Sequence, residues 1–253
     1  MKTQTDRHWN DRAASVENDI EVNIMDIFQR ELEYDAICGY LSPDMRVLEV
    51  GCGNGFSTRR FRELVAHVDA FDYADNMIER AKHSVGETNN RFFLDNVLDP
   101  KHFDGPYDTV ICVRVLINLA DLEQQRQALR NMTEATRSGG LLILAEGFTE
   151  GFDELSHVRT DAGLSPVAPA TINFYSSLED LRPEWEESFD LDDTFHLGAY
   201  DFLTRVVYPK VAGEESVRHN TNFSERCAEI ARVFNPDCLE RFSRMRGLVL
   251  RRR

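Results

Sequence analysis

Between residues 46 and 145, short apolar runs alternate with segments of helical periodicity, and this rhythm restricts the possible folds more than any other feature. Runs rich in β-formers occupy 46–50, 68–71, 91–94, 109–113 and 141–145, and helical patterns occupy 57–67, 75–83 and 122–137. Parallel strands need crossover connections, which helices supply. The alternation therefore predicts an α/β fold with a doubly wound, mostly parallel sheet.

The segments before and after this core have different sequence patterns. Residues 13–40 have apolar side chains at helical spacing until Ser42-Pro43, and residues 147–182 are rich in Gly, Pro, Ser and Asn around a short helix at 154–162. A strand at 194–197, helices at 200–211 and 225–234, and a last strand at 247–250 follow. We expect one compact domain with a helical lead-in or lid at 1–45, a ligand-binding core at 46–148, and substrate-cap insertions plus sheet-completing strands at 149–253.

Charge and cysteine usage limit the partners. The 44 Asp and Glu residues exceed the 29 Lys and Arg residues by 15, and such an acidic surface disfavours nucleic acid and membrane surfaces. No apolar run is long enough to span a bilayer, and the N-terminus lacks a signal-peptide pattern, so a cytoplasmic protein is expected. The five scattered cysteines form no CxxC pair, which predicts free thiols and no metal site.

A glycine loop lies between the first strand and its helix. Gly51, Gly53 and Gly55 allow positive φ and close approach of a ligand to the backbone. The dinucleotide pattern GxGxxG would require glycine where the chain has Phe56, so the pattern is ExGxGxG instead. Asp72, about 20 residues further on, is placed where a carboxylate can accept both hydroxyls of a ribose. A tight turn without a ligand is the alternative interpretation of the glycines.

Four segments in order resemble the class I S-adenosylmethionine (SAM)-dependent methyltransferases. They are VLEVGCGNG, VDAFDYADNMIERA, FFLDNVLD and FDGPYDTVICVRVLINLAD, and they are spread across residues 46–148. The resemblance implies a Rossmann-like fold with SAM as cofactor. The flanking segments VNIMDIFQRELE, EGFTEGFDELSHVRTDAGL and INFYSS more faintly resemble bacterial small-molecule methyltransferases of surface-polysaccharide biosynthesis.

The cofactor's amino-acid tail, ribose and adenine each need a partner. The resemblance implies that Glu49 and the glycine backbone bind the tail, that Asp72 binds the diol, and that Asp95 accepts from the adenine amino group. The complete expected cofactor set is Glu49, Gly51, Cys52, Gly53, Asp72, Tyr73, Met77, Asp95, Asn96, Val97, Val113 and Arg114. The alternative is that Asp72 and Asp95 only form turns, and Asp75 reads as a helix cap.

Acceptor residues are expected beyond the carboxyl ends of the strands. An alcohol or phenol acceptor needs a proton acceptor, which makes Glu146, His157 and His196 catalytic candidates. Either histidine is as readily a surface or structural residue. Expected substrate contacts are Asn118, Phe148, Arg159, Asn173 and Tyr175, although the aromatic residues could instead be core.

These features favour a SAM-dependent methyltransferase acting on a small polar metabolite, such as a sugar or surface-polysaccharide precursor, by O-methylation. A noncatalytic SAM-binding module is the first alternative. A NAD(P)-dependent oxidoreductase is disfavoured by Phe56. Nucleic-acid methylation is disfavoured because the fourth strand continues without an NPPY or DPPY tetrapeptide, and no Pro-Cys nucleophile follows.

Overall fold

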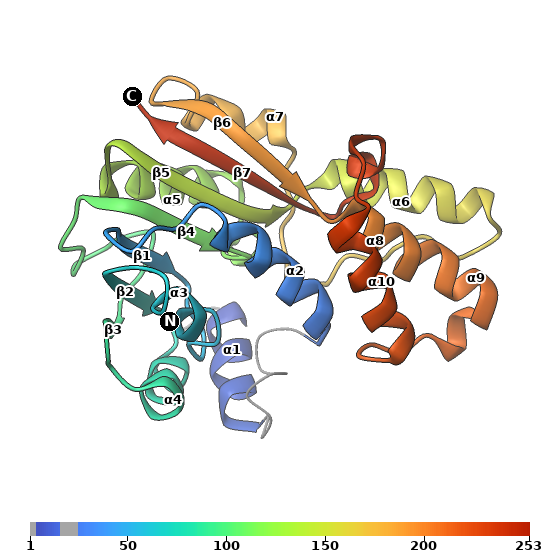
Figure 1. Ribbon diagram of the computed structural model, residues 1–253, viewed down its shortest axis with the longest axis horizontal. Helices are drawn as coiled ribbons and strands as arrows, with labels where there is room; N and C mark the ends of the chain where they lie inside the picture. The colour runs from blue at the N-terminus through green and yellow to red at the C-terminus, as the bar shows by residue number, and fades with distance from the viewer. Residues whose placement is uncertain (1–3, 16–24) are drawn as a thin grey trace.

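A seven-stranded sheet forms the centre of the computed structural model, which describes residues 4–15 and 25–253 (Figure 1). The spatial order is β3-β2-β1-β4-β5-β7-β6. The first five strands in this order pair in parallel, and β7 is antiparallel to both β5 and β6. The strands are β1 (Arg46–Val50), β2 (His67–Asp72), β3 (Asn90–Leu94), β4 (Tyr107–Val113), β5 (Thr136–Gly147), β6 (Phe189–His196) and β7 (Met245–Arg252). The predicted α/β class, with a mostly parallel sheet, is confirmed.

Helices cover both faces of the sheet. They are α1 (Gln4–Ser15), α2 (Ile27–Cys38), α3 (Thr58–Phe61), α4 (Asp75–Val85), α5 (Leu122–Ala135), α6 (Thr149–Asp161), α7 (Leu178–Leu181), α8 (Gly198–Phe202), α9 (Tyr208–Ala212) and α10 (Asn222–Val233). A π-helical segment, Leu203–Val207, joins α8 to α9. Short 3₁₀ turns cover Leu116–Asn118, Arg182–Glu184, Glu214–Ser216 and Asp237–Phe242. None of the helices in the described part of the chain is long and apolar enough to cross a membrane.

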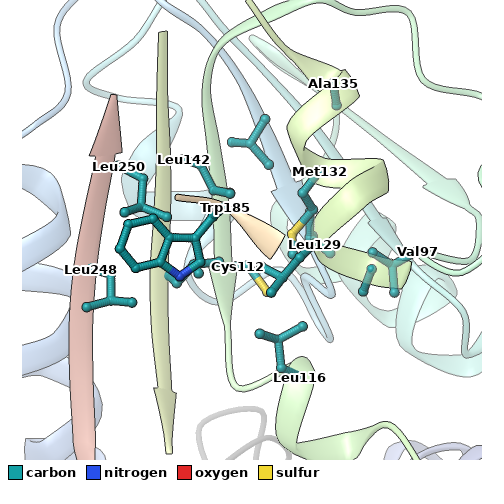
Figure 2. Packing of buried hydrophobic residues seen from close by; sticks show 14 of the residues in the cluster. Val97, Cys112, Leu116, Leu129, Met132, Ala135, Leu142, Trp185, Leu248 and Leu250 are labelled. Atoms are coloured by element: carbon teal, nitrogen blue, oxygen red, sulfur yellow. The ribbon is translucent and has the colours of Figure 1, made fainter. Parts of the chain in front are cut away.

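The core has one layer on each face of the sheet. On one face, α5 packs Leu129 and Met132 against β4 and β5, with Trp185 beside Leu248 and Leu250 of β7 (Figure 2). On the other face, α2, α3 and α4 contribute Ile37, Phe61 and Ala81. Parallel strands buried on both faces need continuous apolar runs, and the runs in the sequence supply them.

Local capping explains where several helices begin. The carboxylate of Asp121 accepts a hydrogen bond from the Gln124 amide at 2.9 Å, which starts α5 at the predicted residue. Asp75 is not the cap that the sequence suggested. Ala74 holds the N-cap position of α4, and Asp75 lies in the first turn, where its negative charge favours the positive end of the helix dipole.

Several element boundaries differ from the prediction, among them the starts of α6 at Thr149 and of β6 at Phe189. The helix expected over 57–67 is limited to Thr58–Phe61 and continues as turns. The sequence SGG does not precede the last parallel strand but lies within β5, where a register shift opposite Tyr107 and Thr109 accommodates it. The N-terminal helical region forms α1 and α2, and the part of the prediction that falls on 16–24 lies outside the described residues.

The C-terminal helices gather beyond one end of the sheet. In Figure 1, α6, α8, α9 and α10 lie together at the end of the sheet where β5 leads into α6. Leu32 of α2, Tyr200 of α8 and Ala228 of α10 share one buried cluster. This packing brings α2 between the sheet and the C-terminal helices, above the loops that follow the strands.

Candidate cofactor and acceptor site

A cavity of about 300 Å³ lies at the carboxyl ends of the parallel strands. Its walls come from the loops after β1, β2, β3 and β4, from α1 and α2, and from residues 170–173. The chain reverses its direction of strand addition between β1 and β4, and such a switch point is where open α/β sheets bind ligands. The volume lies in the range of small-molecule pockets.

The glycine loop is built for close approach. Gly51, Gly53 and Gly55 all have positive φ, at +68°, +54° and +76°. A Cβ atom on Gly51 would lie 2.4 Å from Cγ2 of Val115, so only glycine fits between the loop after β1 and the loop after β4. Gly51, Cys52 and Gly53 line the cavity, and their contact with a cofactor stays a prediction.

Asp72 ties the loops after β1 and β2 together. One oxygen of its carboxylate accepts from the Gly53 amide and the other from the Ala74 amide, both at 2.9 Å. The side chain lines the cavity, and burial raises the pKa of Asp72 to about 6. Each oxygen keeps a further acceptor position, so the carboxylate fits a diol. Tyr73 and Met77, which follow it, also line the cavity.

Asp95 organises the loop after β3. Its carboxylate accepts from the amides of Asn96 at 2.8 Å, Lys101 at 3.0 Å and His102 at 2.8 Å. These bonds hold the Asn96 and Val97 backbone at the cavity wall. Asp95 also lines the cavity, but most of its acceptor capacity is used within its own loop. The contact with an adenine amino group therefore stays a prediction.

Glu49 lies beneath the glycine loop. Its carboxylate accepts from the hydroxyl groups of Ser57 and, at 2.5 Å, Thr58, and burial raises the pKa of Glu49 to about 7. The Arg30 guanidinium of α2 lies 4.0 Å above the Phe56 ring and lowers this pKa in part by its charge. Arg30, Tyr34 and Ser57 line the same part of the cavity.

The sequence reasoning missed these cationic and hydroxyl groups. Arg30 is 1% exposed, although a basic residue on an amphipathic helix normally lies at the surface. Its neighbours in the sequence, Gln29 and Glu33, are buried as well. A polar run at buried helical positions could have been found only from the packing of α2.

Helix α1 contributes three residues to the cavity wall. Nε1 of Trp9 donates to Oδ1 of Asn118 at 3.2 Å, and Nδ2 of Asn118 donates to the Arg114 carbonyl at 2.5 Å. His8 and Arg12 line the cavity on the same helix. Burial, and then the charge of Arg12, lowers the pKa of His8 below its ordinary value. None of the three α1 residues was anticipated.

The loop after β4 is fixed from two sides. Arg114 has a positive φ of +57°, and its guanidinium forms an ion pair with the buried Glu33 of α2. Val113, Arg114 and Asn118 line the cavity. From the other side, the Phe174 amide donates to the Ile117 carbonyl at 2.8 Å. The neighbouring Asn173, whose Nδ2 donates to the Tyr175 hydroxyl at 2.9 Å, joins the lining, while Tyr175 does not.

None of the three candidate bases lines the cavity. Glu146 is 1% exposed and points into the protein, where its carboxylate accepts from the amides of Val115 at 2.7 Å and Leu116 at 3.0 Å. His157 is on the exposed face of α6, 3.6 Å from Asp161. His196 accepts from the Gly198 amide at the end of β6. The placement does not fit a direct role in proton transfer for any of them.

Three expected substrate contacts are also elsewhere. Phe148 is core, packed with the α5 face of the sheet. The Arg159 guanidinium pairs with Glu214 and donates to the Arg205 and Ser165 carbonyls. Tyr175 packs against Phe152 with ring centroids 4.5 Å apart. The core alternative holds for the buried Phe148 and Phe152, whereas Phe174 is exposed and Tyr175 is half-buried.

The fold, the glycine loop and the carboxylate after β2 together define a class of protein. Residues 47–140 match the family model described as a methyltransferase domain. In its fold and in this domain, the chain is similar to the class I SAM-dependent methyltransferases, whose cofactor is SAM.

Among curated relatives, the malonyl-[acyl-carrier protein] O-methyltransferase of Bacillus anthracis is 31% identical over 113 residues. That match covers 44% of this chain and 40% of the relative, so the chain spans less than half of it.

Solved structures share the fold over nearly the whole chain. Magnesium protoporphyrin IX methyltransferase from Synechocystis PCC 6803 with bound SAH has a TM-score of 0.62 at 17% identity, covering 100% of this chain and 96% of that one. The [4+2]-cyclase SpnF has a TM-score of 0.60 at 14% identity, covering 97% and 92%. At this level of identity the likeness concerns the fold alone.

Proposed function

We propose that the protein transfers the methyl group of SAM to a small amphipathic molecule, most simply by O-methylation. The observation that carries this proposal is that one cavity extends from the cofactor loops to α1 and residues 170–173. A cofactor-binding site alone would need only the loops after β1, β2 and β3. The continuation of the same cavity past Arg114 provides the place for a second molecule.

The residues at the cofactor end fit SAM by their chemistry. Asp72 can accept both ribose hydroxyls, and the Gly51–Gly53 backbone leaves room for the amino-acid tail. Arg30 offers a guanidinium for the carboxylate of that tail, because it lies beside Glu49 beneath the glycine loop. When bound, SAM supplies an electrophilic methyl group on a sulfonium.

The chain's own task is alignment and exclusion of water. Methyl transfer is an in-line displacement, so holding the acceptor against the donor supplies much of the rate. The Trp9–Asn118 hydrogen bond holds α1 against the loop after β4 at the cavity wall, and the Glu33–Arg114 ion pair keeps that loop in place. We propose residues 1–45 as the lid, 46–148 as the cofactor core and 149–253 as the cap with the remaining strands.

The acceptor end favours a molecule with an apolar portion. Its polar side chains are His8, Arg12, Asn118 and Asn173, and they stand among apolar ones, namely Met25, Ile117, Leu119, Ala170 and Ile172. A bare sugar or polysaccharide precursor would leave hydroxyl groups unpaired against these surfaces. A hydroxylated molecule with an alkyl or ring portion satisfies both kinds of wall.

A hydroxyl acceptor needs a proton acceptor within reach, and we propose His8. The acids of the lining are engaged: Glu33 with Arg114, Glu49 with two hydroxyls, and Asp72 and Asp95 with backbone amides. His8 lines the cavity, and its lowered pKa keeps the imidazole neutral at pH 7. A neutral imidazole nitrogen can take the proton.

The first test identifies the acceptor and the cofactor together. S-adenosylhomocysteine at about 100 times its dissociation constant should stabilise the protein by roughly 2.7 kcal/mol, and NAD should not. Cell extract incubated with methyl-labelled SAM should then yield a labelled small molecule. Stabilisation without any label transfer would favour the noncatalytic binding module, and equal stabilisation by NAD would overturn the cofactor assignment.

The second test concerns the base. His8→Asn should lower kcat about 10²- to 10⁴-fold with the labelled acceptor, because it removes the proton acceptor while a polar group remains. His157→Asn is the matched control, since His157 is on the exposed face of α6, and it should leave kcat unchanged. Equal rates in the His8 variant and the wild type would contradict the assignment.

A further inference from the structure

A second cavity, of about 170 Å³, lies on the α5 face of the sheet near its β6 edge. It is formed between the segment 178–185 and the strands β6 and β7. Its lining consists of Leu178, Arg182, Trp185, Leu191, Thr194, Glu240, Arg246, Gly247 and Leu248. Among the described residues, it shares no lining side chain with the cofactor cavity.

Two buried donors line this cavity without a hydrogen-bond partner in the described part of the chain. Nε1 of Trp185 is one of them, and Trp185 is only 8% exposed. Nε of Arg246 is the other, on a side chain that is 17% exposed. A buried donor without an acceptor costs free energy, and an acceptor that reaches it from the cavity would recover that cost.

The other lining residues indicate which kind of hydrogen-bond acceptor fits this second cavity. Nη1 of Arg246 lies 3.5 Å from Oε1 of Glu240, so that ion pair holds the guanidinium in position. Arg182 brings a second guanidinium to the exposed rim. Leu178, Leu191 and Leu248 provide apolar walls. Figure 2 shows the Trp185 ring lying beside Leu248, so the indole N–H is carried on an apolar surface.

We propose that this cavity is a binding site for a small organic carboxylate with a short apolar group. A carboxylate has two oxygens that can accept from separate donors, and guanidinium groups recognise it with charge-assisted hydrogen bonds. The alkyl or aryl portion packs against the leucine walls. Inorganic anions lack that portion, and neutral alcohols lack the charge and the second acceptor.

The experiment uses Trp185 as a reporter. The chain has two tryptophans, so Trp9→Phe leaves Trp185 as the single indole in the full-length protein. We expect sodium butyrate to change its fluorescence saturably, and 1-butanol and inorganic phosphate at the same concentrations to give no saturable change. Thermal shift with butyrate in the unsubstituted protein should give the same affinity.

Variants separate a built site from a surface effect. Arg246→Gln should weaken butyrate binding at least 10-fold, and Trp185→Phe, followed by thermal shift, should weaken it as well. Arg251→Gln is the matched control, because Arg251 is on the same strand, pairs with Asp192 and lies outside the lining. Unchanged affinity in Arg246→Gln, equal responses to butyrate and 1-butanol, or a response that never saturates would overturn the proposal.

Discussion

Replacing Glu146 by Gln distinguishes a catalytic from a structural carboxylate at the end of β5. The Glu146 carboxylate accepts from three successive amides, those of Val115, Leu116 and Ile117, at 2.7, 3.0 and 3.4 Å. Cys112 donates to it from β4 at 3.4 Å. Glutamine has the same shape and keeps one carbonyl oxygen for the two shorter amide bonds, but it cannot titrate.

The burial of Glu146 determines how strongly the stability of the protein depends on pH. It raises the pKa of Glu146 from 4.5 to about 7, and the amide hydrogen bonds oppose this increase only in part. The folded state therefore holds the proton more tightly than the unfolded state, so the contribution to stability is complete below pH 4.5 and is lost as pH rises to about 7. A difference of 2.5 pKa units corresponds to about 3 kcal/mol.

The assay is urea unfolding of wild type and variant at pH 5 and pH 8. Other titrating groups, including Glu49 and Asp72, contribute equally to both proteins and cancel in the comparison. From pH 5 to pH 8 the wild type should lose about 2 to 3 kcal/mol relative to Glu146→Gln. If Glu146 only positions the loop after β4, kcat with a labelled acceptor should change less than about 10-fold.

If Glu146 were the catalytic base, we would expect the opposite two results. Turnover would fall about 10²- to 10⁴-fold in the variant. The stability difference would also be the same at both pH values if the carboxylate were solvated rather than buried. Both results together would refute the role of Glu146 as a residue that only holds the loop after β4. A loss of turnover alone would show that its carboxylate reaches the acceptor, and a pH-independent stability difference alone would show that the carboxylate is solvated.

Two further substitutions test the site and its supporting packing. Asp72→Ala should weaken S-adenosylhomocysteine binding, measured by calorimetry, roughly 10- to 150-fold. Binding to the wild type should itself weaken as pH falls below about 6, where Asp72 becomes protonated. Unchanged affinity in the variant would rule out the role of Asp72 in binding the diol. Gly151→Ala would place a Cβ 1.9 Å from the Ser243 carbonyl oxygen, so the free energy of unfolding should fall by about 1 to 3 kcal/mol. Gly39→Ala is the control, because its Cβ would have its nearest atom at 3.4 Å, and it should change stability little. Equal effects of the two substitutions would contradict the packing of α6 on Ser243.

The sequence predicted the sheet well because its signals are local. Each parallel strand is a short apolar run bounded by turn residues, and each crossover helix follows it within a few residues. The glycine loop and Asp72 were equally visible, since their positions are fixed by the strands that precede them. Such residues reach the cavity whatever the rest of the chain does.

The catalytic candidates Glu146, His157 and His196 do not line the cavity. Glu146 also follows a buried strand, but its side chain turns toward the amides after β4 rather than toward the cavity. Strand position alone does not determine that choice, because it depends on the backbone of Arg114 at a φ of +57°. His157 and His196 were candidates by residue type only, and nothing in their spacing related them to the strand ends.

The packing of α2 connects the two ends of the site. Arg30, Glu33 and Tyr34 follow one another at three- and four-residue spacing, so they share one face of the helix. Arg30 and Tyr34 reach the glycine loop, and Glu33 holds Arg114 at the acceptor end. Asp26 caps the same helix and accepts from the Tyr200 hydroxyl of α8 at 2.7 Å. A rigid helix anchored in this way sets the separation of cofactor and acceptor, which an in-line displacement requires.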